Sequence, residues 1–167
     1  MAILEFISDF FKEGEVIRLS SLLQEGVVSF LEENSRNQAL RTLVDALCNA
    51  GKIQQADPFY HAILRREKIV STGIGMGVAV PHAKLEEYAH FFIALGIQKG
   101  NKGIEWDALD KAPVRLIFMI GGPADRQSDY LKILSRLTAA IKDEQFRQKV
   151  YEAESRDEVL QLFEPYE

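Results

Sequence analysis

Hydrophobic residues repeat every three or four positions between residues 35 and 50, as expected for one face of a helix. Ser35 and Gln38 have the spacing of a capping box at its start, and Gly51 stands where such a helix would end. The same period returns in the C-terminal third, which is therefore expected to form three more helices. Their apolar residues are Leu131, Leu134, Leu137 and Ile141, then Phe146 and Val150, then Val159, Leu162 and Phe163.

A further helix is expected to begin at Asp57. Pro58 would stand in its first turn, where the missing N–H group of proline is tolerated. The helix would run to about Glu67, and it would place Arg66 at its C-terminal end.

Four apolar runs have the length of strands rather than helices. They cover residues 27–31, 78–80, 91–97 and 114–120. The last two are nearly continuous rather than alternating, which is typical of strands that are covered on both faces. Strands interleaved with helices predict an α/β fold, a layered sandwich in which a mixed sheet of four to five strands is flanked by helices.

The chain contains no internal repeat and no linker long enough to divide it, so residues 1–167 are expected to form a single domain. Residues 1–16 would be an amphipathic extension of that domain, with acidic side chains opposite an apolar stripe. Such a helix is expected to dock on the domain or on a second subunit, because a membrane-surface helix would favour Lys and Arg. The stripe consists of Ile3, Phe6, Ile7, Phe10 and Phe11.

Charge and composition narrow the possible partners. The 167 residues include 20 Lys and Arg against 25 Asp and Glu, with no basic run longer than a pair, which argues against binding nucleic acid. No apolar stretch approaches the roughly 20 residues that span a bilayer, and the N-terminus lacks the features of a secretory signal. A cytoplasmic protein without a transmembrane segment is therefore expected.

The segment from residue 66 to residue 84 carries the candidate chemistry. Gly73, Gly75 and Gly77 alternate, but Val78 occupies the third glycine position of a dinucleotide fingerprint, and no P-loop ending follows. A nucleotide site is therefore unsupported. After a short apolar strand, a proline holds the chain extended just before His82.

A histidine with an ordinary pKa of about 6.5 offers a neutral nucleophilic nitrogen at neutral pH, so His82 could accept a phosphoryl group. Stabilising the transferred group requires N–H donors, hydroxyls and positive charge. Ser71, Thr72, Arg66, Lys84 and the glycine-rich backbone supply them. Alternatively, the glycines serve tight turns and the histidine ends a strand, and spacing alone leaves both interpretations open. A metal site of His82, Glu86, Glu87 and His90 is conceivable from residue types but matches no defined zinc pattern.

The residues of this segment closely resemble the active-site block of phosphotransferase-system IIA domains of the fructose, mannitol and nitrogen-regulatory class. The resemblance is carried by Arg66-Glu67, by residues 71–75 and by residues 77–83. It continues in residues 103–110, followed by Pro113-Val114, and roughly residues 17–164 fit the family layout.

The resemblance implies a phosphocarrier with a IIA-type fold. The phosphohistidine protein HPr, or a paralogue, would give its phosphoryl group to Nε2 of His82, beside Arg66 as the active-site arginine. The group would then pass to a IIB domain or act as a regulatory state. Ser71 and Thr72 match the family's hydroxyl pair, and the phosphate-binding set is expected to include Gly73, Gly75, Gly77, Lys84 and Tyr130. No metal or organic cofactor is implied.

For Nε2 of His82 to attack, Nδ1 should carry the ring proton and donate it to a neighbouring oxygen. The sequence does not identify that oxygen.

Tyr130 departs from the family pattern. Related proteins have a second histidine just before the helix that starts here, and residues 129–135 are the matching segment. A phenol donates one hydrogen bond but carries no positive charge at neutral pH, so its support for a phosphoryl group should be weaker. Two functions stay open, a phosphocarrier (a transferase) of the nitrogen-regulatory branch rather than a sugar-dedicated one, and a regulatory binding module that no longer relays phosphate to sugar transport. The partner, the sugar and the oligomeric state are not predicted.

Overall fold

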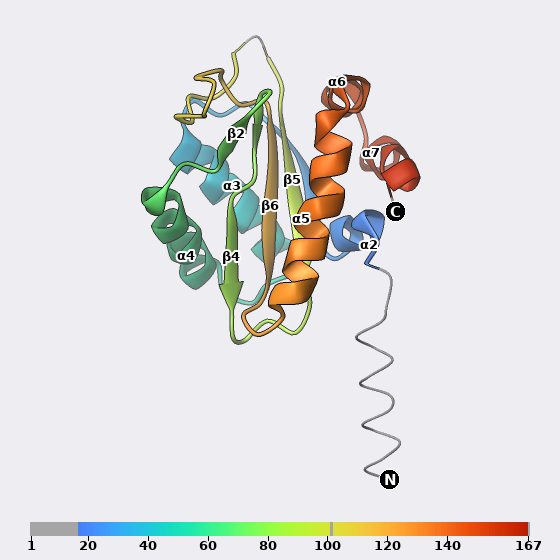
Figure 1. The fold of residues 1–167 in the computed structure, drawn as a ribbon. Coiled ribbons are helices and arrows are strands. Elements are labelled where there is room, and N and C mark those ends of the chain that lie inside the picture. The colour runs from blue at the N-terminus through green and yellow to red at the C-terminus, as the bar shows by residue number, and fades with distance from the viewer. Residues whose placement is uncertain (1–16, 101, 167) are drawn as a thin grey trace.

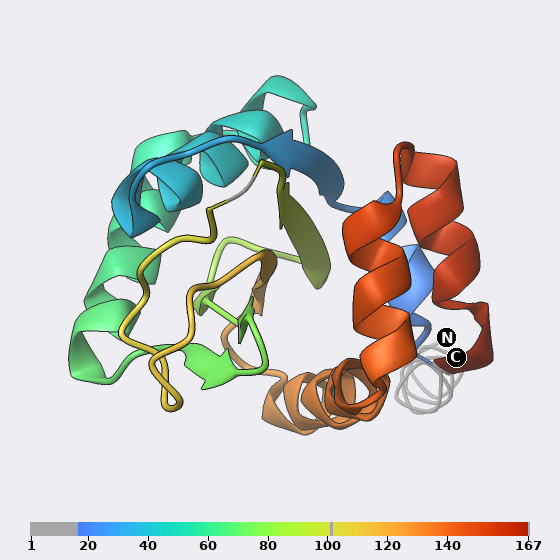
Figure 2. The ribbon, with the colours of Figure 1, turned by 90° about the horizontal axis from the view of Figure 1, so that it is seen from above.

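The computed structural model describes residues 17–100 and 102–166. A mixed sheet lies between two layers of helices (Figure 1), which confirms the predicted α/β sandwich. One face is covered by α3 (Arg36–Asn49) and α4 (Ala56–Ile69). The other is covered by α2 (Leu19–Gln24), α5 (Gln127–Lys142), α6 (Glu144–Glu152) and α7 (Arg156–Leu162), after which the 3₁₀ turn η1 (Glu164–Tyr166) follows. Viewed from above in Figure 2, the two helical layers lie on opposite sides of the strands.

The strands of the sheet are β1 (Val27–Leu31), β2 (Gly73–Gly75), β3 (Val78–Ala79), β4 (His82–Leu85), β5 (Phe92–Gln98) and β6 (Leu116–Pro123). Their order is β1-β5-β6-β3-β2, and β4 also pairs with β6, beyond the end of β3. The β1 to β5, β3 to β6 and β4 to β6 pairs are parallel, whereas β5 to β6 and β2 to β3 are antiparallel.

Within the described residues this sheet has six strands, so the expected number of four to five was too low. The two strands without a predicted counterpart are β2 and β4, and neither contains an apolar run. Both depend on pairing with a neighbour rather than on hydrophobic pattern. Strand β4 matters most, because His82 is its first residue.

The position of β5 and β6 inside the sheet, between two helical layers, explains their continuous apolar sequences. In β5, Ile93 and Leu95 face the layer that contains α5, while Phe92 and Ala94 face α3 and α4. Every residue of both strands is buried, which confirms the prediction of strands covered on both faces. The strands that pair with them therefore rest on a rigid core.

Helix ends agree with the predicted capping residues except at α4. Ser35 accepts a hydrogen bond from the backbone N–H of Gln38, and Ser155 caps α7 in the same way. The predicted start of α4 at Asp57 was wrong by one residue, since the helix begins at Ala56. The Asp57 carboxylate accepts a hydrogen bond from Arg41 at 2.7 Å and makes no cap.

The amphipathic stripe predicted between residues 2 and 11 lies outside the described residues, so the single-domain organisation with an N-terminal extension stays a prediction. Across residues 17–100 and 102–166, the helices are too short or too polar to cross a bilayer.

Candidate functional site

Three elements of the fold bring the candidate site together. His82 begins β4, where it pairs in register with Ile120 of β6. Arg66 lies in the last turn of α4, and Tyr130 lies in the first turn of α5. Lys84 is two residues beyond His82, so it projects from the same face of the strand. Four of the residues predicted from the sequence to carry the chemistry, His82, Arg66, Lys84 and Tyr130, therefore meet at the start of β4.

The His82 ring is held by hydrogen bonds at both nitrogens. Its Nδ1 lies 3.0 Å from the backbone carbonyl of Val80, and its Nε2 lies 3.2 Å from Nε of Arg66. Because the guanidinium can only donate, Nε2 must accept, and in a neutral ring the proton is then on Nδ1. The oxygen that the sequence left unidentified is the Val80 carbonyl. This is the tautomer that leaves the Nε2 lone pair available.

The surroundings of His82 keep the ring neutral. Burial is the main cause that lowers its pKa below the ordinary value of 6.5, and the positive charges of Arg66 and Lys84 lower it further. The Val80 carbonyl and the Glu67 carboxylate act in the opposite direction. A neutral imidazole beside two cations is suited to attack an anionic electrophile.

Tyr130 packs against His82 with 5.4 Å between the ring centroids. The residue is only 5% exposed, and its hydroxyl has no hydrogen-bond partner among the described residues. Burial raises the pKa of the phenol to about 12, so the hydroxyl keeps its proton. Lys84 Nζ lies 4.7 Å from the centroid of the Tyr130 ring and also hydrogen bonds to the side chain of Gln127. The site thus contains an unpaired neutral donor and an ammonium group.

Ser71 and Thr72 lie close to the strand that precedes His82, but both hydroxyls are already engaged. The Thr72 hydroxyl donates to Glu67 at 2.6 Å and accepts from the indole N–H of Trp106 at 3.3 Å. The Ser71 hydroxyl donates to the Trp106 carbonyl at 2.8 Å. A hydroxyl has one proton to donate, so neither residue can donate to a phosphate while these bonds persist.

The three glycines form the β2 to β3 hairpin. Gly77 has a φ of 75°, and Met76 before it has a φ of 60°, a pair of left-handed residues that fits a tight hairpin turn. A Cβ on Gly73 would lie 2.8 Å from the Cβ of Ala108, so close packing requires glycine there. Gly77 is five residues before His82, roughly 16 Å along extended chain. The hairpin geometry agrees with the predicted alternative of tight turns, and among the described residues the side chains that act on the His82 ring come from α4, β4 and α5.

Glu67 is a residue to which the sequence analysis assigned no role. It is 4% exposed, and its carboxylate accepts hydrogen bonds from both the N–H and the hydroxyl of Thr72. The signal was present in the sequence. Phe59, Ile63 and Glu67 follow one another at intervals of four, so the carboxylate falls on the apolar face of α4.

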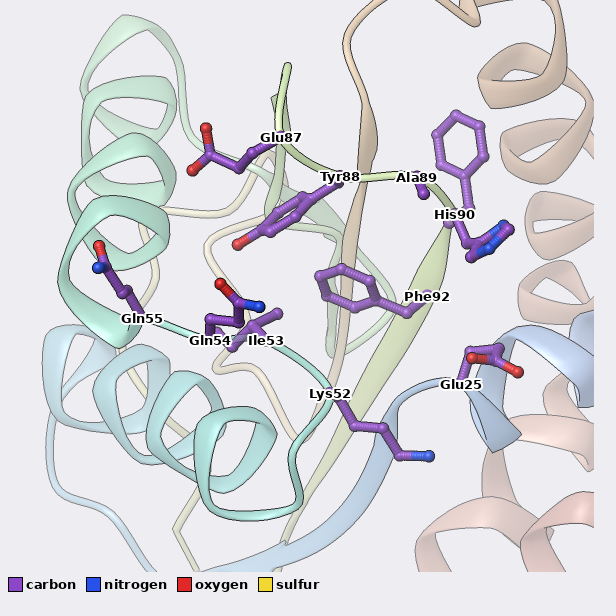
Figure 3. A pocket seen from close by; sticks show the side chains of 11 residues that line it. Glu25, Lys52, Ile53, Gln54, Gln55, Glu87, Tyr88, Ala89, His90 and Phe92 are labelled. Atoms are coloured by element: carbon purple, nitrogen blue, oxygen red, sulfur yellow. The ribbon is translucent and has the colours of Figure 1, made fainter.

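A cavity of about 480 Å³ lies apart from these residues (Figure 3). Tyr88 and Phe92 pack edge to face at 5.5 Å in its wall, with Lys52 and Glu25 at its rim. None of the residues predicted for the phosphoryl site lines it, although Glu87 and His90 of the alternative metal site do. The alternative metal site is not supported either, since no group of three or more His, Cys, Asp or Glu in the described part of the chain could hold a metal ion.

His82 thus lies beside a guanidinium and near an ammonium group on a buried α/β sheet, an arrangement that can support group transfer. Residues 21–166 match the family described as "Phosphoenolpyruvate-dependent sugar phosphotransferase system, EIIA 2", and the chain belongs to this family.

Curated relatives come from both the sugar-transport and the regulatory branches. The chain is 34% identical to the fructose-specific EIIA component of Haloferax volcanii over 146 residues, which is 87% of this chain and 94% of that protein. It is also 34% identical to the nitrogen regulatory protein of Escherichia coli over 149 residues, 87% of this chain and 89% of that one. A 32% match to the fructose-specific EIIABC component of Bacillus subtilis covers 90% of this chain but only 24% of that longer protein.

Solved structures confirm the fold. Nitrogen regulatory protein IIA-Ntr of Neisseria meningitidis superposes with a TM-score of 0.75 at 24% identity, over 83% of this chain and 93% of that one. Escherichia coli enzyme IIA for mannitol, solved in complex with phosphorylated enzyme IIB, gives a TM-score of 0.65 at 22% identity, over 83% and 94% of the two chains. The family match over residues 21–166 and the relatives at 34% identity confirm the predicted family resemblance.

Proposed function

We propose that this chain is a phosphocarrier that takes a phosphoryl group from an HPr-like phosphohistidine protein onto Nε2 of His82. It then passes the group to a IIB-type acceptor or uses it as a regulatory state. The observation that carries the proposal is the pair of hydrogen bonds at the ring, with Val80 at Nδ1 and Arg66 at Nε2. They fix the tautomer and direct the lone pair toward the cationic side chain.

The transfer needs no proton removal from His82. The hydrogen bond from Arg66 to Nε2 is released, and the lone pair of Nε2 forms the new N–P bond, while the P–N bond of the donor breaks and its electron pair returns to the donor nitrogen. Nδ1 keeps its proton and its bond to the Val80 carbonyl, so the phosphorylated ring carries positive charge. Reversing the same step toward an acceptor nucleophile regenerates the neutral ring.

Arg66 is the main group proposed to stabilise the transferring phosphoryl oxygens. Its Nη1 donates to the carbonyl of Val70 at 2.8 Å, which holds the guanidinium beside the imidazole. Lys84 adds a second positive charge, and the unpaired hydroxyl of Tyr130 can donate one hydrogen bond to a phosphoryl oxygen. Phosphate contacts by Ser71, Thr72 and the three glycines stay predictions, which would require the hydrogen bonds described above to rearrange.

This chain has an apolar surface next to the site, to which partner proteins could bind. Ile69 and Val70, three and four residues after Arg66, are 79% and 58% exposed. Because the mannitol IIA relative was solved with a phosphorylated IIB partner, a IIB-type acceptor is proposed for this chain as well. A carrier must release its donor before it meets its acceptor, so both interfaces should be small, below about 1,200 Å². A cytoplasmic location is part of the same proposal.

The test is to incubate the chain with phosphorylated HPr-like proteins and measure its mass. Wild type should gain one phosphoryl group, in an adduct that is labile in acid and stable in base. His61→Ala and His90→Ala serve as matched controls and should behave like wild type. His82→Ala should gain nothing, and label retained in that variant would contradict the assignment.

A regulatory binding module is the second candidate function. It is favoured by Tyr130, which places a neutral phenol where the family resemblance implies a second histidine. The fructose-specific relative and the nitrogen regulatory relative are both 34% identical to this chain, so sequence identity does not choose between a transport role and a regulatory role. A stable complex with unphosphorylated HPr in gel filtration would favour the binding module, whereas rapid turnover with no isolable complex would favour the carrier.

A further inference from the structure

We propose that Glu67 is a positioning residue for His82, which acts through Thr72 and Val80 and balances the positive charge that the ring gains on phosphorylation. This inference rests on the proposed function for its rate measurement, but its second measurement needs no phosphoryl donor.

A continuous series of hydrogen bonds connects the Glu67 carboxylate to the imidazole. Oε1 and Oε2 of Glu67 accept from the N–H and the hydroxyl of Thr72 at 2.9 and 2.6 Å. The carbonyl of Thr72 accepts from the N–H of Val80 at 3.0 Å, and the carbonyl of Val80 accepts from Nδ1 of His82 at 3.0 Å. Each bond fixes the backbone unit that makes the next one, so the position of the ring acceptor depends on the buried carboxylate.

Burial of the Glu67 side chain is expected to cost free energy of folding. A buried carboxylate is destabilising without compensating partners. In the described part of the chain Glu67 forms no ion pair, and Thr72 is the residue that donates to it. An amide at this position could also bond to the Thr72 backbone without the cost of burying a charge. A carboxylate is better explained by a nearby group that becomes positively charged.

His82 is that group. The side chains that act on the ring are Arg66 and Glu67 from α4, Lys84 from β4 and Tyr130 from α5. Both cations favour the incoming phosphoryl oxygens but oppose positive charge on the imidazole. Glu67 opposes them, and it raises the pKa of His82. It therefore stabilises the phosphorylated ring without competing for Nε2.

The experiment compares Glu67→Gln with wild type in two measurements. The amide keeps the size of the side chain and removes its charge, so the pKa of His82, followed by NMR titration of the unphosphorylated protein, should fall. The rate of phosphorylation should fall by roughly 10- to 100-fold, the effect typical of removing an outer partner that orients a histidine ligand.

Glu33→Gln is the matched control. Glu33 also accepts a hydrogen bond from a threonine hydroxyl, that of Thr42 at 2.8 Å, but it follows β1, on the opposite side of β5 and β6 from β4. Both the titration of His82 and the rate should be unchanged in this variant.

An unchanged titration in folded Glu67→Gln would overturn the proposal, even if the rate fell, because the carboxylate would then serve only the fold. If Glu67→Gln does not fold, Thr72→Val and Thr72→Ser replace it. Slow transfer in Thr72→Val with recovery in Thr72→Ser would support the hydrogen-bonded series, and wild-type rates in both would overturn it. If wild type accepts no phosphoryl group, the carrier function fails, whereas the titration still decides the role of Glu67.

Discussion

The segment from Arg66 to Lys84 contains two regions of different character, a tightly packed hairpin and a cluster of polar and charged side chains. The hairpin of β2 and β3 uses its glycines for a tight turn and for close packing against Ala108. The region around His82 instead gathers two cations, a buried carboxylate and an unpaired phenol around one ring. The glycines therefore serve the fold, whereas the residues around His82 form the candidate site. The two groups are neighbours in sequence, but extended chain separates the turn from the imidazole.

Because of this difference, the glycines and the histidine should be tested separately for their effects on stability and on phosphorylation. Substitutions in the hairpin should change stability with little effect on chemistry, and substitutions around His82 should do the reverse.

The largest effect is expected for Arg66→Ala. Loss of one preorganised donor costs roughly 10²–10³ in rate in comparable sites, so phosphorylation by a phosphorylated HPr-like protein should slow by that factor. The melting temperature should move little, since the side chain is half-exposed and its structural bond is to a single carbonyl. Arg65→Ala, at the exposed neighbouring position, is the control. Equal rates for Arg66→Ala and wild type would remove the guanidinium from the mechanism.

Gly73→Ala tests the other region. The new Cβ would lie 2.8 Å from the Cβ and 2.9 Å from the Cα of Ala108, so the free energy of unfolding should drop by about 1–3 kcal/mol. Gly77→Ala should cost about 1–2 kcal/mol for a different reason, its φ of 75°. Chemical denaturation measures both. The phosphorylation rate per folded molecule should stay at the wild-type value, and a large fall would return the glycines to the phosphate site.

Tyr130→Phe should affect stability and rate in opposite directions. Removing a buried hydroxyl without a partner should raise the free energy of unfolding by about 1 kcal/mol. Losing a neutral hydrogen bond to the phosphoryl group should slow transfer by roughly 2- to 10-fold. Tyr130→His should accelerate transfer, because an imidazolium makes a charge-assisted bond. Thermal melts and stopped-flow kinetics provide the two measurements, and unchanged kinetics in both variants would end the claim that this residue tunes the site.

The smallest effect is expected for the pH dependence of the phosphorylation rate and of stability. Burial holds the pKa of His82 below 6.5, so Nε2 should stay unprotonated as pH falls to that value, and the rate should decline only at lower pH. The unfolded chain binds the proton more readily, so this histidine should make the fold less stable as pH falls below about 6.5 and have no such effect above it. NMR titration, with His82→Ala to assign the signal, checks the midpoint. A midpoint above 6.5 would mean that the ring is not held neutral as described.

Much of the fold was predictable, because long apolar patterns determine it. The helices at residues 35–50 and in the C-terminal third were expected, as were the doubly covered strands β5 and β6. The short strands β2 and β4 were not, because Gly73–Gly75 and His82–Leu85 contain no apolar run; β2 forms by hairpin pairing with the adjacent β3, and β4 forms by pairing with β6, which is distant in sequence.

The candidate site was predictable in its side chains but not in its backbone. His82, Arg66, Lys84 and Tyr130 meet as expected. The partner of Nδ1 could not be found, since it is a main-chain carbonyl that every residue possesses. Engagement of the Ser71 hydroxyl was equally hidden, because it donates to the carbonyl of Trp106, more than thirty positions away. The Thr72 hydroxyl donates instead to Glu67, to which the sequence had assigned no role.

The choice of the Val80 carbonyl as ring acceptor has an evolutionary consequence. A side-chain carboxylate in this place could be lost by a single codon change, and the histidine would then be free to adopt the other tautomer. A main-chain carbonyl survives every substitution that preserves the local path of the chain. The orientation of the His82 ring is thereby insensitive to substitution of the side chain at position 80. Side chains around the ring, the one at position 130 included, can then change without removing the acceptor that fixes its tautomer.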